Sequence, residues 1–159
     1  MDIKDPLFSE VIDRLLAHQV VFLLIGGYAV NFYGYGRYTG DIDFWLEPSN
    51  ENKAKFITAL KTLSNNTELI EYANQLDFTL KQSIQIGKVP HRIDFLTYVN
   101  LVDFDEAWEK RKQIPFHDQM LQIVHYDHLI VMKFNTGRPK DKLDIEELQR
   151  RNKGKTPDI

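Results

Sequence analysis

The spacing of apolar and polar residues divides the chain into helical and extended segments. Apolar residues recur three and four positions apart between Asp5 and Leu16, which predicts an amphipathic helix. Asp5 suits the N-cap of this helix and Pro6 suits its first turn. Short apolar runs bounded by glycine or polar residues predict strands instead. The expected strands cover residues 20–25, 41–46, 83–86, 92–99, 114–116 and 120–124.

The intervals between these strands carry further helical patterns. One stretch, residues 67–80, has a weaker pattern: residues 69–73 fit a short strand or a helix, and residues 78–80 alternate weakly, like an exposed strand. A turn over residues 87–90 predicts a hairpin between its flanking strands. Together the elements predict an α/β (α+β) fold with a mixed sheet of about five strands flanked by helices. The expected helices cover residues 28–33, 51–64, 104–112, 127–136 and 139–148.

Length and composition restrict the class of protein. The 159 residues predict a single domain over residues 1–150, followed by a flexible tail over residues 151–159. A net charge of −3 gives no general attraction to nucleic acid, and the lack of cysteine excludes disulfides and thiolate metal sites. The first residues do not resemble a signal peptide, and no apolar run is long enough to cross a membrane. We therefore expect a cytoplasmic protein.

Two adjacent glycines interrupt the chain directly after the first expected strand. Gly26 and Gly27 allow a tight turn and leave backbone amides open to a ligand. The helix expected over residues 28–33 would place those amides at its N-terminus, where an anion is favoured. The pattern predicts a phosphate-binding bend.

Acidic residues mark the start of the next strand. Asp41 and Asp43 lie two positions apart, so they project from the same face of that strand. Close carboxylates raise each other's pKa unless a cation lies between them, and oxygen ligands suit Mg²⁺. Asp94 lies in another expected strand, and pairing of the two strands would bring three carboxylates beside the glycine bend. Such a site suits phosphoryl-type transfer. Arg92 shares a face with Asp94, so a plain surface salt bridge is the alternative.

The order of these motifs resembles the polymerase-β-like nucleotidyltransferase superfamily: Gly26-Gly27, thirteen residues, Asp41-Ile42-Asp43 and a distant Ile93-Asp94-Phe95. Residues 36–43 look like the small bacterial members. Lys133 and residues 137–144 are similar to the Arg-x-Lys-Asp segment of abortive-infection-type toxin nucleotidyltransferases. The size and order also resemble the minimal lincosamide nucleotidyltransferases. The resemblance covers residues 20–148.

The resemblance implies transfer of a nucleoside monophosphate from an NTP such as ATP to an acceptor, with release of pyrophosphate. It implies Mg²⁺ as cofactor, with Mn²⁺ as a substitute, held by the catalytic carboxylates Asp41, Asp43 and Asp94. The Lys140-Asp141 pair would belong to the functional segment, or would simply be a charged helix N-terminus. The nucleotide-binding residues implied are Gly26, Gly27, Arg37, Thr39, Lys133, Arg138, Lys140 and Asp141.

Three functions remain open on these residues. A toxin-like enzyme would modify tRNA or a protein and have a cognate antitoxin as partner, and the segment from Arg138 to Asp141 favours it. An enzyme that modifies an antibiotic of the lincosamide type, a small-molecule acceptor, is favoured by the minimal length. A non-catalytic nucleotide-binding or interaction module would keep the fold, and the presence of all three carboxylates counts against it.

Overall fold

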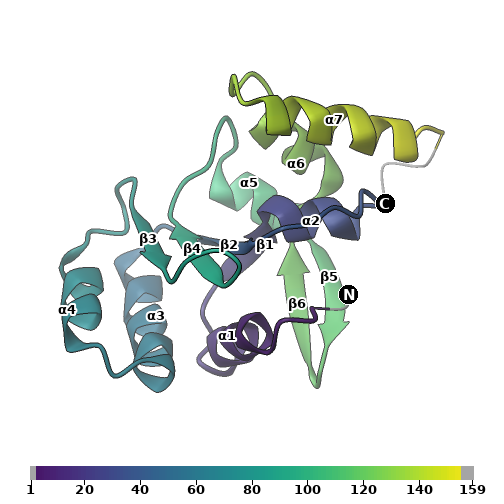
Figure 1. Ribbon diagram of the computed structural model, residues 1–159. Coiled ribbons are helices and arrows are strands. Elements are labelled where there is room, and N and C mark those ends of the chain that lie inside the picture. Colours follow the sequence, from purple (N-terminus) through teal and green to yellow (C-terminus); the bar gives the residue numbers. More distant parts are fainter. Residues whose placement is uncertain (1–2, 155–159) are drawn as a thin grey trace.

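A single mixed β-sheet forms the centre of the molecule in the computed structural model, which describes residues 3–154 (Figure 1). Its strand order is β3-β4-β2-β1-β6-β5. Six strands are present in the sheet where about five were expected, and the hairpin β5–β6 joins it beside β1. The strands are β1 (Phe22–Ile25), β2 (Asp41–Leu46), β3 (Ser83–Ile86), β4 (Arg92–Leu96), β5 (Lys112–Phe116) and β6 (Gln119–Ile123).

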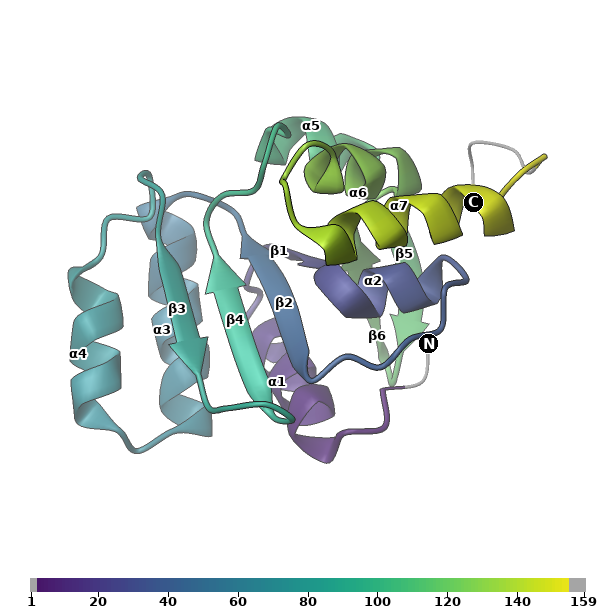
Figure 2. The same cartoon turned by 45° about the horizontal axis from the view of Figure 1, so that its top comes forward.

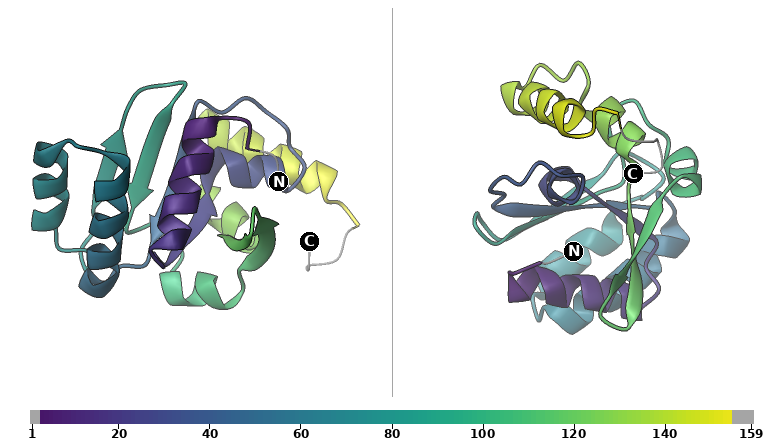
Figure 3. Two further views of the ribbon diagram at one scale, coloured as in Figure 1. Left: turned by 90° about the horizontal axis from the view of Figure 1, so that it is seen from below. Right: turned by 90° about the vertical axis from the view of Figure 1, so that its right-hand side faces the viewer.

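Helices cover both faces of the sheet. Helices α1 and α3 lie against one face, with α4 beside α3, whereas α2, α6 and α7 lie on the other face (Figures 1 and 3). The view in Figure 2 shows α7 lying beside α2 and α6. The helices are α1 (Pro6–Ala17), α2 (Gly26–Phe32), α3 (Asn50–Leu63), α4 (Thr67–Gln75), α5 (Phe104–Glu109), α6 (Tyr126–Lys133) and α7 (Pro139–Arg151).

The central strands differ in how much of each one is buried. All four residues of β1 are buried. In the first residues of β2 and β4 apolar side chains alternate with charged ones, so one face joins the core while the other carries the carboxylates and Arg92. Phe44 of β2 stacks on Phe95 of β4 with ring centroids 5.5 Å apart. Packing of this kind on the inner face fixes which residues project from the outer face.

The register brings three chain segments to one end of the sheet. β1 runs antiparallel to β2 and pairs Ile25 with Asp43, while β4 runs parallel to β2 and pairs Asp43 with Asp94. The end of β1 therefore lies beside the starts of β2 and β4. The glycine pair that follows Ile25 is thereby placed next to the acidic residues of both neighbouring strands.

Several element boundaries differ from the sequence expectation. Residues 69–73 belong to helix α4, which Asn66 caps by accepting a hydrogen bond from the Leu69 amide at 3.1 Å. Residues 78–80 form no strand, because Phe78 turns into the core between the elements. Strand β4 ends at Leu96 rather than residue 99, and α2 begins at Gly26 rather than residue 28. Helix α6 is capped by the His125 side chain, not by Asp127.

The C-terminal helix reaches further than its sequence pattern indicated. Helix α7 continues to Arg151, and the buried Asn152 side chain donates hydrogen bonds to the carbonyls of Tyr33 and Leu148. These bonds fasten the end of α7 to the end of α2. Residues 155–159 of the predicted tail lie outside the described residues. Within residues 3–154, no helix has both the length and the apolar character that crossing a membrane requires.

Candidate active site

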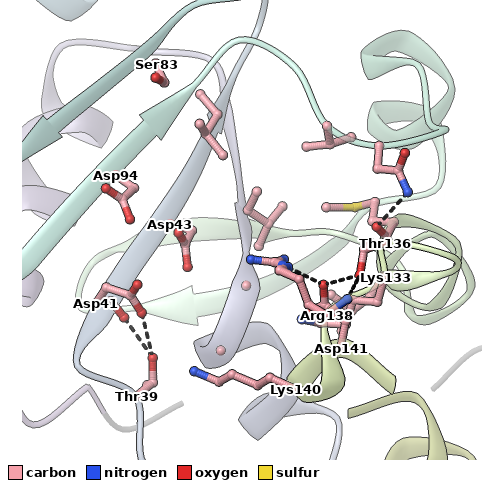
Figure 4. A pocket seen from close by; sticks show the side chains of 18 of the residues that line it. Thr39, Asp41, Asp43, Ser83, Asp94, Lys133, Thr136, Arg138, Lys140 and Asp141 are labelled. Atoms are coloured by element: carbon pink, nitrogen blue, oxygen red, sulfur yellow. Dashed lines mark hydrogen bonds and ion pairs between the residues drawn. The ribbon is translucent and has the colours of Figure 1, made fainter. Parts of the chain in front are cut away.

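Three carboxylates meet on the outer face of the sheet. Asp41 and Asp43 project from β2 and Asp94 projects from the adjacent β4. One oxygen from each carboxylate lies within 4.8 Å of the other two, a spacing that a single metal ion can bridge. Figure 4 shows the three side chains on the same side of the pocket. The convergence expected from the sequence is therefore present in the fold.

The charge of this cluster is incompletely balanced by the protein. Burial raises the pKa of Asp43 to about 7, and the neighbouring charges of Asp41 and Asp94 add to the effect, while Lys133 and Arg92 oppose it. A buried carboxylate with two acidic neighbours is stabilised by a bound cation. The all-oxygen donor set, with no soft ligand, fits a hard divalent ion such as Mg²⁺ or Mn²⁺. These residues therefore fit the metal that the sequence resemblance led us to expect.

Arg92 lies between two of the three carboxylates. Its Nη2 donates to Oδ2 of Asp41 at 2.5 Å, and its Nε donates to Oδ2 of Asp94 at 3.1 Å. The sequence left open a surface salt bridge between Arg92 and Asp94. The ion pair exists, but it is partly buried and includes Asp41 as well, because the register places Arg92 directly opposite that residue.

The glycine bend lies in contact with the carboxylates. Gly26 has a φ of +69°, and a Cβ atom added there would lie 2.1 Å from Oδ2 of Asp43. A Cβ atom on Gly27 would lie 2.6 Å from Oγ1 of Thr39. Both positions therefore exclude a side chain, Gly26 also through its backbone conformation. The backbone of the bend can consequently approach a ligand held beside Asp43.

A network of charges, buried except for the exposed Arg138 side chain, lies across the pocket from the carboxylates. Asp144 accepts hydrogen bonds from Arg37 at 2.7 and 2.8 Å and forms an ion pair of 2.9 Å with Lys133. Asp141 contacts Lys133 at 3.1 Å and Arg138 at 2.6 Å. Lys140 points from α7 toward the side of the pocket that holds Asp41 and Asp43 (Figure 4).

Both aspartates of this network are stabilised as anions. Burial by itself raises the pKa of Asp141 and Asp144, but the hydrogen bonds and cations around them outweigh burial. The pKa of each therefore lies below the ordinary aspartate value. The predicted residue Asp141 is almost fully buried, and it contacts the cations rather than presenting its carboxylate to solvent.

These groups surround one cavity of about 450 Å³. All eleven residues that the sequence analysis selected line it, so the structure brings together segments more than 100 residues apart. Part of the cavity lining is apolar, which the sequence did not indicate. This apolar wall consists of Leu96, Tyr98, Val99, Leu129 and Met132.

Sequence reasoning missed three polar residues of the site. Asp144 lies in the segment that resembles the toxin enzymes and was assigned no role, although it is the fully buried centre of the charge network. Arg92 was read as a partner of Asp94 alone. Gln85 of β3 donates to Oδ1 of Asp94 at 3.1 Å, and no sequence signal separates it from other polar strand residues. The strand period identifies a shared face for Arg92, but only the register identifies Asp41 as its second partner.

Comparison with protein families agrees with this geometry. Residues 6–158 match the model of a family described as "Nucleotidyl transferase of unknown function (DUF2204)". The chain belongs to this nucleotidyl transferase family. The membership favours an enzyme over the non-catalytic module, and confirms the resemblance to minimal nucleotidyltransferases. No curated protein matches the chain.

Among solved structures, the chain is similar to the lincosamide antibiotic adenylyltransferase LnuA in its lincomycin-bound crystal structure. The TM-score is 0.57 at 15% sequence identity, and the match covers 94% of this chain and 98% of that chain. At this identity the likeness concerns the fold. The mixed, helix-flanked sheet of the nucleotidyltransferase fold is thus confirmed.

Proposed function

We propose that this nucleotidyltransferase moves a nucleoside monophosphate from an NTP to a hydroxyl or phosphate of an acceptor in the 450 Å³ cavity. The observation that carries the proposal is the meeting of Asp41, Asp43 and Asp94 beside the glycine bend, with cationic side chains across the cavity. Carboxylates that hold a metal and cations that face a triphosphate are the two requirements of this reaction.

Asp41, Asp43 and Asp94 would hold Mg²⁺, for which Mn²⁺ is the substitute. When bound, the metal supplies Lewis acidity toward the triphosphate oxygens. Metal dependence rests on the donor set described above, whose spacing and oxygen chemistry suit such an ion.

The protein's own groups position the reactants. The amides of Gly26 and Gly27 bind the β- and γ-phosphates, and Arg37 with Thr39 contacts the same phosphates from beside the bend. Asp94 accepts the proton of the acceptor as the acceptor oxygen bonds to the α-phosphorus. The bond from the α-phosphorus to the bridging oxygen breaks and pyrophosphate leaves. The leaving charge is stabilised by Lys133, Arg138 and Lys140, which line that side of the cavity.

Two acceptor classes are each favoured by one observation. The apolar wall, which Leu96 at the end of β4 shares with Leu129 and Met132 of α6, favours a small molecule with a hydroxyl group and an apolar face, as an antibiotic of the lincosamide type has. The Arg138–Asp141 segment, whose two basic side chains lie at the cavity, favours a toxin-like enzyme acting on tRNA or a protein. A cognate antitoxin accompanies that second candidate, and we propose a cytoplasmic location for either.

Substitution of the carboxylates tests the reaction. Asp41→Asn, Asp43→Asn and Asp94→Asn should each lower transfer from α-³²P-labelled NTP by about a thousandfold or more. Asp105→Asn on α5, which removes an exposed carboxylate far from the cavity, is the matched control. Circular dichroism and thermal unfolding check that each variant folds. Normal transfer by a folded triad variant would show that its carboxylate has no catalytic role.

Labelled NTPs also test the acceptor. The full chain is incubated with each of the four α-labelled NTPs and with lincomycin, bulk tRNA or cell protein, in Mg²⁺, Mn²⁺ or EDTA. Label that moves to lincomycin supports the antibiotic-modifying candidate, whereas label on tRNA or protein supports the toxin-like one. The Asp43→Asn protein serves as the blank in every arm.

A further inference from the structure

The guanidinium of Arg92 occupies the place where a cation bridges the carboxylates. It lies on β4 directly opposite Asp41 and two residues before Asp94 on the same face. From there it reaches Oδ2 of both aspartates, at 2.5 Å and 3.1 Å. A metal bound by the triad would use oxygens of these same two carboxylates. The guanidinium and the metal therefore compete for one pair of anions.

Uncharged polar groups lie beside the other oxygen, Oδ1, of the same two carboxylates. Oγ1 of Thr39 lies 3.1 Å from Oδ1 of Asp41, and Nε2 of Gln85 lies 3.1 Å from Oδ1 of Asp94. A neutral donor can remain on a carboxylate when a metal binds, since it adds no repulsion toward the metal. The permanent positive charge of Arg92 would repel a bound metal ion, so metal binding is weakened as long as the guanidinium stays in place.

Arg92 also has room to move. Its side chain is 33% exposed and lines the cavity, whereas the backbone of β4 stays paired with β2 on its own hydrogen bonds. Rotation of the side chain into the cavity breaks only its two ion pairs. The exchange of guanidinium for metal therefore requires no change of the sheet.

We propose that Arg92 is a positioning residue that holds Asp41 and Asp94 together before the metal binds, and that the metal must displace it. Without a cation between them, the three carboxylates repel one another at the edge of β2 and β4. Arg92 supplies that cation in the metal-free protein. Because the metal must displace it, the metal binds more weakly than it would without Arg92. The inference rests on the proposed role of the triad as metal ligands.

Mn²⁺ titration of the full chain, followed by electron paramagnetic resonance without nucleotide, tests this exchange. Arg92→Gln should lower the Mn²⁺ dissociation constant about tenfold, because the competing charge is gone. Lys88→Gln is the matched control: it removes the same charge from an exposed residue in the turn before β4, outside the cavity lining. We expect its Mn²⁺ affinity to equal that of the wild type. Asp43→Asn should bind Mn²⁺ far more weakly and identifies the site.

Thermal unfolding supplies a second measurement. In EDTA, Arg92→Gln should unfold at a lower temperature than the wild type and Lys88→Gln, and Mn²⁺ should raise its unfolding temperature by more than it raises theirs. Arg92→Lys keeps the charge but cannot bridge both carboxylates, so its Mn²⁺ affinity should lie between those of the wild type and Arg92→Gln. This variant tests the exchange even if Arg92→Gln does not fold.

The two proposals fail in distinguishable ways. Equal or weaker Mn²⁺ binding by Arg92→Gln and Arg92→Lys, relative to the wild type, would overturn the displacement of Arg92. Absence of Mn²⁺ binding from every variant would remove the metal site and this inference with it. Tighter Mn²⁺ binding by Arg92→Gln without nucleotide transfer by any form of the protein would sustain the inference and contradict the proposed function.

Discussion

Arg37 and Asp144 form a two-bonded ion pair across 107 residues of chain, with Nε to Oδ1 at 2.7 Å and Nη2 to Oδ2 at 2.8 Å. Asp144 is fully buried, and the same carboxylate contacts Lys133. The pair joins the loop that precedes β2 to helix α7. It thereby sets the positions of two cations that line the cavity.

Loss of this carboxylate should destabilise the protein. Asp144→Asn leaves Arg37 and Lys133 without one anionic partner in a buried site, and breaking such a pair costs about 3–5 kcal/mol of the free energy of unfolding. Urea unfolding at pH 7 measures the change. Glu146→Gln, which removes a carboxylate of α7 outside this network, should change the free energy of unfolding by less than about 1 kcal/mol. Equal effects of the two substitutions would contradict the role of Asp144.

The same network predicts a dependence of stability on acid. The folded-state pKa of Asp141 and of Asp144 lies below the unfolded value, so their contribution to stability is fully present above the unfolded pKa of about 3.9. It is lost as the pH falls through the folded-state pKa values. The stability gap between the wild type and Asp144→Asn should therefore narrow as the pH decreases from 5 toward 2. Urea unfolding across this range measures it, and a constant gap would contradict the assignment.

A side chain at the glycine bend should disturb nucleotide binding. The Cβ of Gly27→Ala would lie 2.6 Å from Oγ1 of Thr39 and 3.3 Å from Nη1 of Arg37, so both groups must move away from the bend. We expect kcat/KM for the NTP to fall about 10- to 100-fold. Gly36→Ala is the matched control, since a Cβ there meets nothing within 4 Å, and it should retain the wild-type kcat/KM.

Two exposed lysines of α7 allow a direct role in the site to be distinguished from an effect of net charge alone. Lys140 lines the cavity, whereas Lys142 lies outside its lining. Lys140→Ala should reduce kcat about tenfold or more, since one donor to the leaving pyrophosphate is removed, and Lys142→Ala should leave kcat unchanged. Steady-state transfer kinetics at fixed ionic strength compare the two proteins, which carry the same net charge. Equal kcat values would exclude Lys140 from the reaction.

The sequence predicted most elements because local patterns decided them. The apolar stripe of α1 matches the helical period, and β1 is a short, continuous apolar run that ends at glycine, so the burial of both elements follows from the local sequence. The stretch from residue 67 to residue 80 was ambiguous because its short helix is mostly exposed and has a single buried residue, Ala73. The side chain of Phe78 enters the core from a turn, which no period could indicate.

The sequence by itself determined the chemistry of this protein, namely the positions of its carboxylates, cations and glycines in the chain. It also determined which strand residues share a face. Strand periodicity was enough to place Asp41 and Asp43 side by side. Only the tertiary structure decided that Asp94 joins them, that Arg92 lies between two of the three, and that Asp144 binds Arg37. Those contacts depend on the parallel register of β2 with β4 and on the packing of α7, and both are set by interactions between segments far apart in the chain.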